Sequence, residues 1–219
     1  MRNWFKVFVL VAGLCILPAA LADDTQIPEG FQSLFNGKDL TGWQVNDKGD
    51  MKVWGAENGV LYVNGSGGGW LMTDKEFSDF ELRLEFKIPP KGNSGVALRS
   101  PLKGDPAYVG MEIQILDNDW YQKNYKGLKA VQHTGAIYGV VPPSKDVTKP
   151  VGEWNKYRII VKSRQVTIEL NGTTIVDADL DDQKEHYKQH PGLQRQTGHL
   201  GLQSHDGRVE FRNIYVKPL

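Results

Sequence analysis

Two polar residues of one short segment have the type and spacing to do chemistry on a small molecule. Glu112 and Gln114 alternate with the apolar residues Met111, Ile113 and Ile115. Alternate side chains of a β-strand point to opposite faces. The pattern therefore predicts a strand that buries its apolar residues and places a carboxylate and an amide about 7 Å apart on its other face. A solvated sheet face would explain the same pattern equally well.

Polar residues of two other segments alternate with apolar residues in the same way, so they could lie on the same face of the sheet as Glu112. Gln203 and His205 alternate with inward-facing leucines, and Arg99 is opposite in phase to Val96 and Leu98. If the three segments are strands of one sheet, these side chains and Glu112 line one concave face. A surface ion pair for Arg99, and closure of the following turn for His205, are the alternatives.

Four further residues are candidates for binding or catalysis. His133 and Tyr138 lie in a segment that leads from a loop into a strand, and Asp117 ends the strand of Glu112. Trp70 follows a glycine-rich run, where it would stack on a sugar ring or fill the core. No pair of histidines has the spacing of metal ligands, and there is no dinucleotide fingerprint. We therefore predict no metal site and no cofactor.

The number of carboxylates on one face of the strand distinguishes glycoside hydrolysis from proton abstraction next to a carbonyl. Retaining glycoside hydrolysis needs two carboxyl groups about 5–5.5 Å apart. The in-phase positions here are Glu112, Gln114 and Leu116, and Asp117 is out of phase, so a second carboxylate is missing. One base flanked by hydrogen-bond donors suits abstraction of a proton next to a carbonyl, with stabilisation of the enolate that forms.

The elements that must position these residues are predicted to be short β-strands joined by turns rich in Gly, Pro, Asn and Asp. Residues 80–88 alternate strictly between apolar and charged types, which is typical of a strand with one buried face. Many such strands predict an all-β jelly-roll β-sandwich. The other expected elements are strands at 31–34, 54–63, 96–99 and 111–116, a hairpin at 157–170 with a return strand at 173–176, a last strand pair at 199–205 and 208–216, and a short polar helix at 180–190.

The N-terminus has the pattern of a cleaved signal peptide. Arg2 and Lys6 precede an apolar run that ends before Ala20-Leu21-Ala22. That run is shorter than the ~20 residues of a membrane span. An N-terminal anchor helix is the alternative. We predict a signal peptide at 1–22, a single domain at 23–219, a periplasmic or secreted location, and no membrane association after cleavage.

Composition narrows the classes of partner. Removal of residues 1–22 from the 219 takes away two basic residues and leaves 24 Lys and Arg against 26 Asp and Glu. This balance favours neither nucleic acid nor an anionic membrane surface. The one cysteine, Cys15, lies in the predicted signal, so the mature chain forms no disulfide.

Nine stretches resemble one family, in order across nearly the whole mature chain. They lie at 31–43, 79–82, 93–96, 110–118, 134–139, 152–155, 170–172, 201–205 and 211–214. Together they resemble the 3-keto-disaccharide hydrolases, also described as 3-keto-glucoside 1,2-lyase or 3-keto-2-hydroxy-glucal hydratase domains. The resemblance implies a concanavalin A-like jelly roll and a carbohydrate substrate already oxidised at C3. An upstream glucoside 3-dehydrogenase would supply that substrate, and the resemblance leaves a divalent metal open.

The resemblance also suggests roles for the candidate residues. Glu112 is the first choice for the base that removes the C2 proton, with His133 and His205 as competitors. Arg99 or Gln114 would stabilise the keto or enolate oxygen, and Tyr138 or His205 would protonate the leaving oxygen. Three other functions stay open: a non-catalytic carbohydrate-binding module, which would use aromatic residues such as Trp70; a conventional glycoside hydrolase; and a surface interaction domain.

Overall fold

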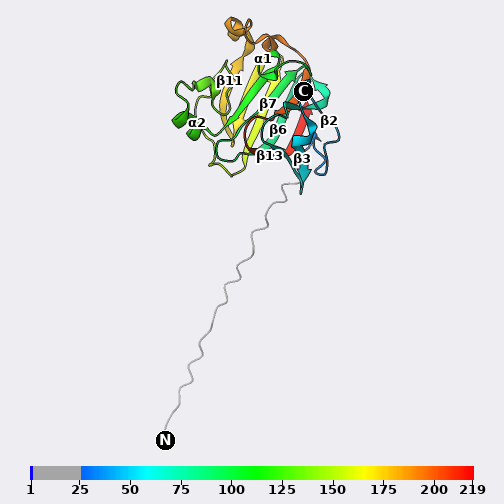
Figure 1. Ribbon diagram of the computed structural model, residues 1–219, viewed down its shortest axis with the longest axis vertical. Coiled ribbons are helices and arrows are strands. Elements are labelled where there is room, and N and C mark those ends of the chain that lie inside the picture. Colours follow the sequence, from blue (N-terminus) through cyan, green and yellow to red (C-terminus); the bar gives the residue numbers. More distant parts are fainter. Residues whose placement is uncertain (2–25) are drawn as a thin grey trace.

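The computed structural model describes Met1 and residues 26–219, which form two antiparallel β-sheets (Figure 1). One sheet contains β1 (Gln32–Ser33), β3 (Trp54–Glu57), β4 (Val60–Asn64), β6 (Phe80–Lys87), β9 (Asn155–Lys162), β10 (Gln165–Leu170), β11 (Thr173–Asp179) and β13 (Arg208–Pro218). These strands lie in the order β11-β10-β9-β6-β13-β4-β3, with β1 paired to β13.

The second sheet has five strands, and short helices lie in the connections between strands. Its strands are β2 (Trp43–Val45), β5 (Trp70–Phe77), β7 (Asn93–Ser100), β8 (Met111–Leu116) and β12 (Gly198–Gln203), in the order β2-β5-β12-β7-β8. The α-helices are α1 (Pro106–Val109) and α2 (Asn118–Asn124). The 3-10 helices are η1 (Met51–Val53), η2 (Ala130–Gln132), η3 (Leu180–His186) and η4 (Pro191–Gln194).

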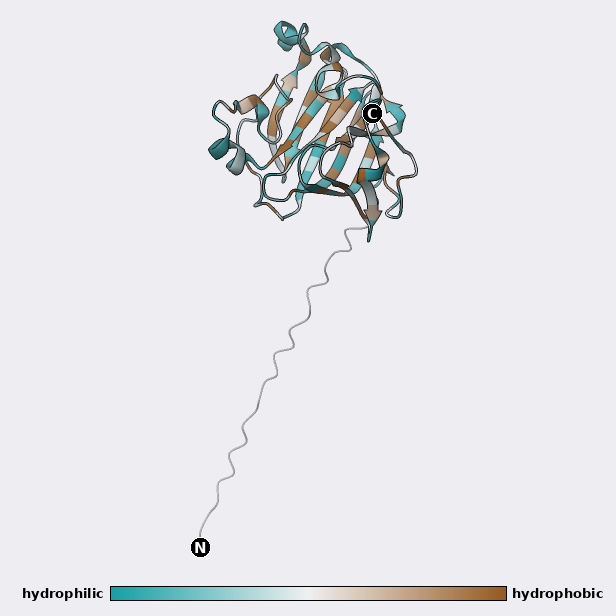
Figure 2. Cartoon of the chain, in the orientation of Figure 1, coloured by the Kyte–Doolittle hydropathy of each residue, from teal (hydrophilic) through white to brown (hydrophobic). Residues whose placement is uncertain are grey.

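The core lies between the sheets and follows from the alternation of side chains along the strands. Phe80, Leu82 and Leu84 of β6 belong to the same buried cluster as Ile113 and Ile115 of β8. Figure 2 shows the alternation as hydrophobic and hydrophilic bands along the strands. Burial of each large apolar side chain contributes about 1.5–3 kcal/mol. The core face of β8 thereby fixes the direction of its other face, which carries Glu112.

The predicted all-β jelly roll is confirmed, and so are β6, β8 and the β9–β10 hairpin, within one or two residues. The predicted pairing of 199–205 with 208–216 is wrong. β12 pairs with β5 and β7, whereas β13 pairs with β1, β4 and β6 of the other sheet. The turn at Asp206-Gly207 therefore crosses from one sheet to the other.

Two predictions concern the N-terminus and the short helices. The predicted signal peptide, apart from Met1, lies outside the described residues. The polar helix expected at 180–190 is the 3-10 segment η3, which is kinked at Gln183. Within residues 26–219, no helix is long and apolar enough to cross a membrane.

Candidate active site

The carboxylate of Glu112 is buried beneath a pocket on the outer face of the five-stranded sheet. The side chain is 3% exposed, and no hydrogen bond joins its carboxylate to a described residue. Space for it comes from Gly95 on the neighbouring strand β7. A Cβ atom at position 95 would lie 2.8 Å from the carboxyl carbon of Glu112, and closer still to its Oε1 atom. The glycine is therefore required for this placement of the carboxylate.

A small polar pocket of about 140 Å³ surrounds Glu112. Five residues predicted from the sequence line it, from β8, β12 and the loops beside them: Glu112, Gln114, Tyr138, Gln203 and His205. Four lining residues were missed by the sequence analysis: Asn93, Asp105, Ala107 and Tyr108. Asn93 begins β7, and the other three lie at the start of α1. The sequence there has no alternation of apolar and polar residues from which their positions could be predicted.

Backbone pairing along β8 brings Tyr138 to the pocket. Residues 134–138 run beside β8, where the Gln114 amide donates to the carbonyl of Ala136 at 3.1 Å and the Tyr138 amide donates to that of Glu112 at 2.9 Å. The Tyr157 hydroxyl, from the opposite sheet, donates to the Gln114 carbonyl at 2.7 Å. These bonds hold residues 134–138 beside β8 at the pocket.

The pocket holds a second carboxylate, Asp105, which has a structural role as well. Its side chain caps α1 by accepting a hydrogen bond from the Ala107 amide at 3.1 Å. Burial, followed by the negative charge of Asp105, raises the pKa of Glu112 well above its ordinary value of 4.5. Burial disfavours the ionised form, and a neighbouring like charge acts in the same direction. Glu112 is consequently a stronger base than a solvated carboxylate, and takes up a proton at a higher pH.

Two side-chain amides in the pocket carry buried oxygen atoms that lack a hydrogen-bond donor. These atoms are Oδ1 of Asn93 and Oε1 of Gln203, and they are the two such side-chain atoms found among the described residues. A buried acceptor without a donor costs about 1–3 kcal/mol. A molecule with hydroxyl groups, or bound water, would supply the missing donors.

The ring of Tyr108, which lines the pocket, packs on a buried histidine outside the lining. The Tyr108 ring stacks on His190, with centroids 5.1 Å apart. His190 is buried, and its Nδ1 atom lies 3.2 Å from the carbonyl oxygen of Ala107. Burial is the main cause that lowers the pKa of His190 below 6.5, so the ring under Tyr108 is neutral at neutral pH.

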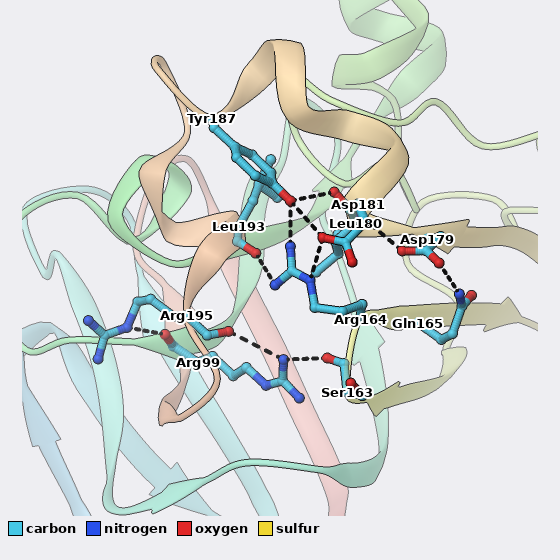
Figure 3. A network of polar contacts seen from close by, with 10 residues as sticks. All are labelled: Arg99, Ser163, Arg164, Gln165, Asp179, Leu180, Asp181, Tyr187, Leu193 and Arg195. Carbon is cyan, nitrogen blue, oxygen red and sulfur yellow. Dashed lines mark hydrogen bonds and ion pairs between the residues drawn. The ribbon is translucent and has the colours of Figure 1, made fainter.

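Arg99, predicted to bind substrate, does not reach the pocket. Its guanidinium donates to the carbonyls of Ser78, Ser163 and Arg195 at 2.7, 2.9 and 3.3 Å, and pairs with Asp79 at 2.8 Å. Figure 3 shows part of this network. Arg99 has φ of +48°, and the pairing register between β7 and β12 shifts beside it. The strand alternation used to place the residue therefore fails there.

Three other predicted site residues also lie outside the pocket. Trp70 is buried against Met72 and Ala97, on the same sheet face but away from Glu112. The Nε2 atom of His133 lies 3.1 Å from Oε1 of Gln122.

Asp117 caps α2 by accepting from the Trp120 amide at 3.1 Å, and its other oxygen accepts from the Lys91 amide at 2.8 Å. It lines a separate cleft of about 510 Å³, together with Trp120 and Asp146. Residues 26–219 contain no cluster of three or more His, Cys, Asp or Glu side chains arranged to hold a metal ion.

Comparison with known proteins identifies relatives over most of the chain. A 3-keto-disaccharide hydrolase of Bacteroides thetaiotaomicron is 30% identical, over 93% of this chain and 84% of its own length. A crystal structure of a Parabacteroides distasonis protein, provisionally described as a glycosyl hydrolase, superimposes with a TM-score of 0.77 at 31% identity, over 87% of this chain and 94% of that one.

A more distant likeness concerns the fold alone. A Bacillus subtilis protein with a galectin-like fold superimposes with a TM-score of 0.53 at 11% identity, over 81% of this chain and 90% of that one. The family described as the 3-keto-alpha-glucoside-1,2-lyase-like domain matches residues 30–217. Since that match spans both sheets and the whole pocket, the chain belongs to the family of 3-keto-alpha-glucoside-1,2-lyase-like domains.

Proposed function

We propose that this protein cleaves the glycosidic bond of 3-keto-glucosides, including 3-keto-disaccharides, with Glu112 as the base. The single observation that carries the proposal is a buried carboxylate of raised pKa that faces a polar pocket and has no hydrogen-bond donor of its own. Such a group is available to take a proton from a bound molecule. The name of the Bacteroides relative supports the same class of substrate.

The proposed reaction begins at the carbon next to the ketone. The C3 ketone acidifies the C2 proton, which Glu112 removes, and the electron pair of the C–H bond forms an enolate on the C3 oxygen. As the enolate collapses, a double bond forms between C1 and C2, and the C1–O bond breaks. The aglycone oxygen takes a proton, and the sugar leaves as a 2-hydroxy-3-keto-glucal. No electrons pass to an external acceptor, so we propose no redox cofactor.

Hydration would complete a net hydrolysis in the same pocket. Water adds across the C1–C2 double bond: its oxygen bonds to C1, the proton it loses passes to the group that protonated the aglycone oxygen, and protonated Glu112 returns its proton to C2. The product is the free 3-keto sugar. Gln114, beside Glu112 on β8, is the proposed group near the keto or enolate oxygen, since Arg99 is engaged elsewhere.

The unpaired amide oxygens support a substrate rich in hydroxyl groups. Oδ1 of Asn93 and Oε1 of Gln203 need donors, and sugar hydroxyls supply them. A ketone oxygen only accepts hydrogen bonds, so we propose that the C3 position faces away from these two atoms. The pocket is small, with a volume of about 140 Å³. This favours one sugar ring in the pocket and an aglycone outside it.

Paired substrates test this function directly. The purified protein is incubated with a native glucoside and with the same glucoside oxidised at C3, and products are identified by mass spectrometry with and without a chelator. We expect cleavage of the 3-keto form alone, and loss of this cleavage in Glu112→Gln. Undiminished turnover in a folded Glu112→Gln protein would rule out Glu112 as the base. Binding of both sugars without cleavage would indicate a carbohydrate-binding module.

Conventional glycoside hydrolysis is a second candidate because of one observation. Asp105 supplies the second carboxylate that the strand itself lacks, and burial together with the charge of Asp105 raises the pKa of Glu112. A protonated acid beside an ionised carboxylate is the arrangement that general acid catalysis of glycoside hydrolysis uses. Cleavage of the native glucoside at a rate similar to that of the 3-keto form would favour this candidate.

Export and a preceding oxidation complete the proposed role. Because the substrate must carry a C3 ketone, an enzyme that oxidises the C3 hydroxyl of a glucoside has to act first. Residues 1–22 are proposed to direct the chain to the periplasm or the medium. N-terminal sequencing of the exported protein would contradict the predicted cleavage site if the mature chain did not begin at Asp23.

A further inference from the structure

We propose that Asp206, supported by Tyr121, is a positioning residue that presents His205 as the acid for the leaving-group oxygen. This inference rests on the proposed elimination, in which the aglycone oxygen must gain a proton as the C1–O bond breaks. From the sequence, His205 and Tyr138 are both candidates for that role. The hydrogen bonds around His205 distinguish the two.

One carboxylate oxygen holds both His205 and Tyr121. Nδ1 of His205 lies 2.8 Å from Oδ2 of Asp206, and the Tyr121 hydroxyl donates to the same oxygen at 3.0 Å. A carboxylate accepts hydrogen bonds, so the nitrogen that faces it carries the hydrogen. Nε2 is then the ring atom that gains and loses a proton. His205 lines the same pocket as Glu112, which puts an acid and a base in one site.

Asp206 is itself fixed through its backbone and through Tyr121. Its amide donates to the Asn93 carbonyl, and the Asn93 amide donates back to the Asp206 carbonyl, both at 3.0 Å. Burial, then the bond to Asp206 and the charge of that carboxylate, raise the pKa of Tyr121 to about 12. The phenol therefore remains a donor throughout the neutral range. It begins the second turn of α2, and its ring stacks on Tyr125 at 4.9 Å.

Tyr138 lacks this support. Its hydroxyl accepts a hydrogen bond from the Gln132 side chain at 3.3 Å, and no hydrogen bond joins it to a carboxylate of the described residues. A group that delivers a proton in each turnover needs a partner that stabilises both of its states, as Asp206 does for an imidazole. We assign Tyr138 to substrate contact and His205 to proton delivery.

The proton movements balance over one turnover. Glu112 takes the C2 proton, and protonated His205 gives its Nε2 proton to the aglycone oxygen as the C1–O bond breaks. The products are the glucal and a neutral alcohol. The enzyme is left with protonated Glu112 and neutral His205, and exchange with water restores both groups.

Leaving-group dependence separates this role from a structural one. We compare Asp206→Asn with the wild type on two 3-keto-glucosides, those of methanol and of 4-nitrophenol. Methoxide needs a proton in order to leave, whereas 4-nitrophenolate leaves without one. General acid catalysis contributes about 10²–10⁴-fold. We expect kcat to fall by at least about 100-fold on the methyl substrate and by less than about three-fold on the nitrophenyl substrate, with the same pattern in His205→Gln.

The controls keep failure of the inference distinct from failure of the proposed function. Tyr121→Phe removes one of the two hydrogen bonds to the Asp206 carboxylate, so its effect should have the same selectivity at a smaller size. Equal losses on both substrates, or an unchanged rate on the methyl substrate, would overturn the inference while the elimination stands. A wild-type protein that cleaves neither 3-keto-glucoside would overturn the proposed function as well.

Discussion

Replacement of Gly95 by alanine tests whether the position of Glu112 matters. The new Cβ atom would lie 2.8 Å from the carboxyl carbon of Glu112, where ordinary contact begins at 3.4 Å. The carboxyl group must therefore move by at least 0.6 Å, and its nearer oxygen by more. Misplacement of a catalytic group by about 1 Å costs on the order of 10²-fold in rate. We expect Gly95→Ala to reduce kcat/KM for a 3-keto-glucoside by about 10- to 100-fold.

The fold should survive this substitution. Gly95 is not among the glycines of positive φ, and the atoms nearest to its added Cβ belong to a side chain, not to the backbone. Crowding of this kind costs about 1–3 kcal/mol of stability. Urea unfolding would measure that loss separately from the loss of activity.

Gly201→Ala is a matched control for the same experiment. Gly201 lies on the adjacent strand β12, and its added Cβ would crowd the sulfur of Met72, the flexible end of a side chain outside the pocket. We expect a similar loss of stability, with kcat/KM within about three-fold of the wild type. A folded Gly95→Ala protein with full activity would refute the argument that the buried position of Glu112 is needed for turnover.

Three further substitutions have defined outcomes. Asp105→Asn keeps a helix-capping side chain but removes the charge that raises the pKa of Glu112, so the acid-side fall of kcat/KM should move to lower pH; an unchanged profile would contradict this. Arg99→Met should lower the free energy of unfolding by about 1–3 kcal/mol, because buried carbonyls lose their donor, and leave KM within two-fold, as measured by urea unfolding and steady-state kinetics. The pKa of His190 in the folded protein lies below 6.5, its ordinary value in the unfolded chain. The stability that neutral His190 contributes is therefore complete above pH 6.5. It is lost as the pH falls from 6.5 through the pKa of the folded protein. His190→Gln should therefore flatten the acid side of the stability profile between pH 7 and pH 4, and a profile that stays as steep as that of the wild type would count against this origin.

Local alternation was enough to predict most of the strands, although not β2 or β5, and five of the nine residues that line the pocket. The core demands that Ile113 and Ile115 face inward, and this leaves Glu112 and Gln114 only one direction. Gln203 followed by the same rule. These predictions needed no knowledge of the partner strands, because the period of two is a property of the strand itself.

Residues placed by loops were beyond this rule. Asp105 and Tyr108 reach the pocket from the short helix α1, and Asn93 stands at the start of a strand that was predicted to begin later. Arg99 was misplaced because its positive φ breaks the alternation on which its prediction depended. His133 and Asp117 form hydrogen bonds outside the pocket, with Gln122 and with the Lys91 amide. These partners come close only in the tertiary fold, so the local sequence could not predict the contacts.

The turn at Asp206-Gly207 led to a wrong prediction of strand pairing for a different reason. A polar turn between two alternating segments is typical of a hairpin, yet here the chain crosses between the sheets. The local sequence predicts the turn, but it does not determine which strands pair with β12 and β13. That choice depends on the packing of the whole sandwich.

The same crossing makes the proposed acid depend on segments that are far apart in the chain. His205 and Asp206 lie between β12 of one sheet and β13 of the other, and their partner Tyr121 is more than eighty residues earlier in the chain. The proposed acid therefore needs β7, the helix α2 and the turn after β12 to be in place together. We therefore expect turnover to recover later than β-structure during refolding, because turnover requires these segments to be packed together. An activity assay would then report on completion of the tertiary structure.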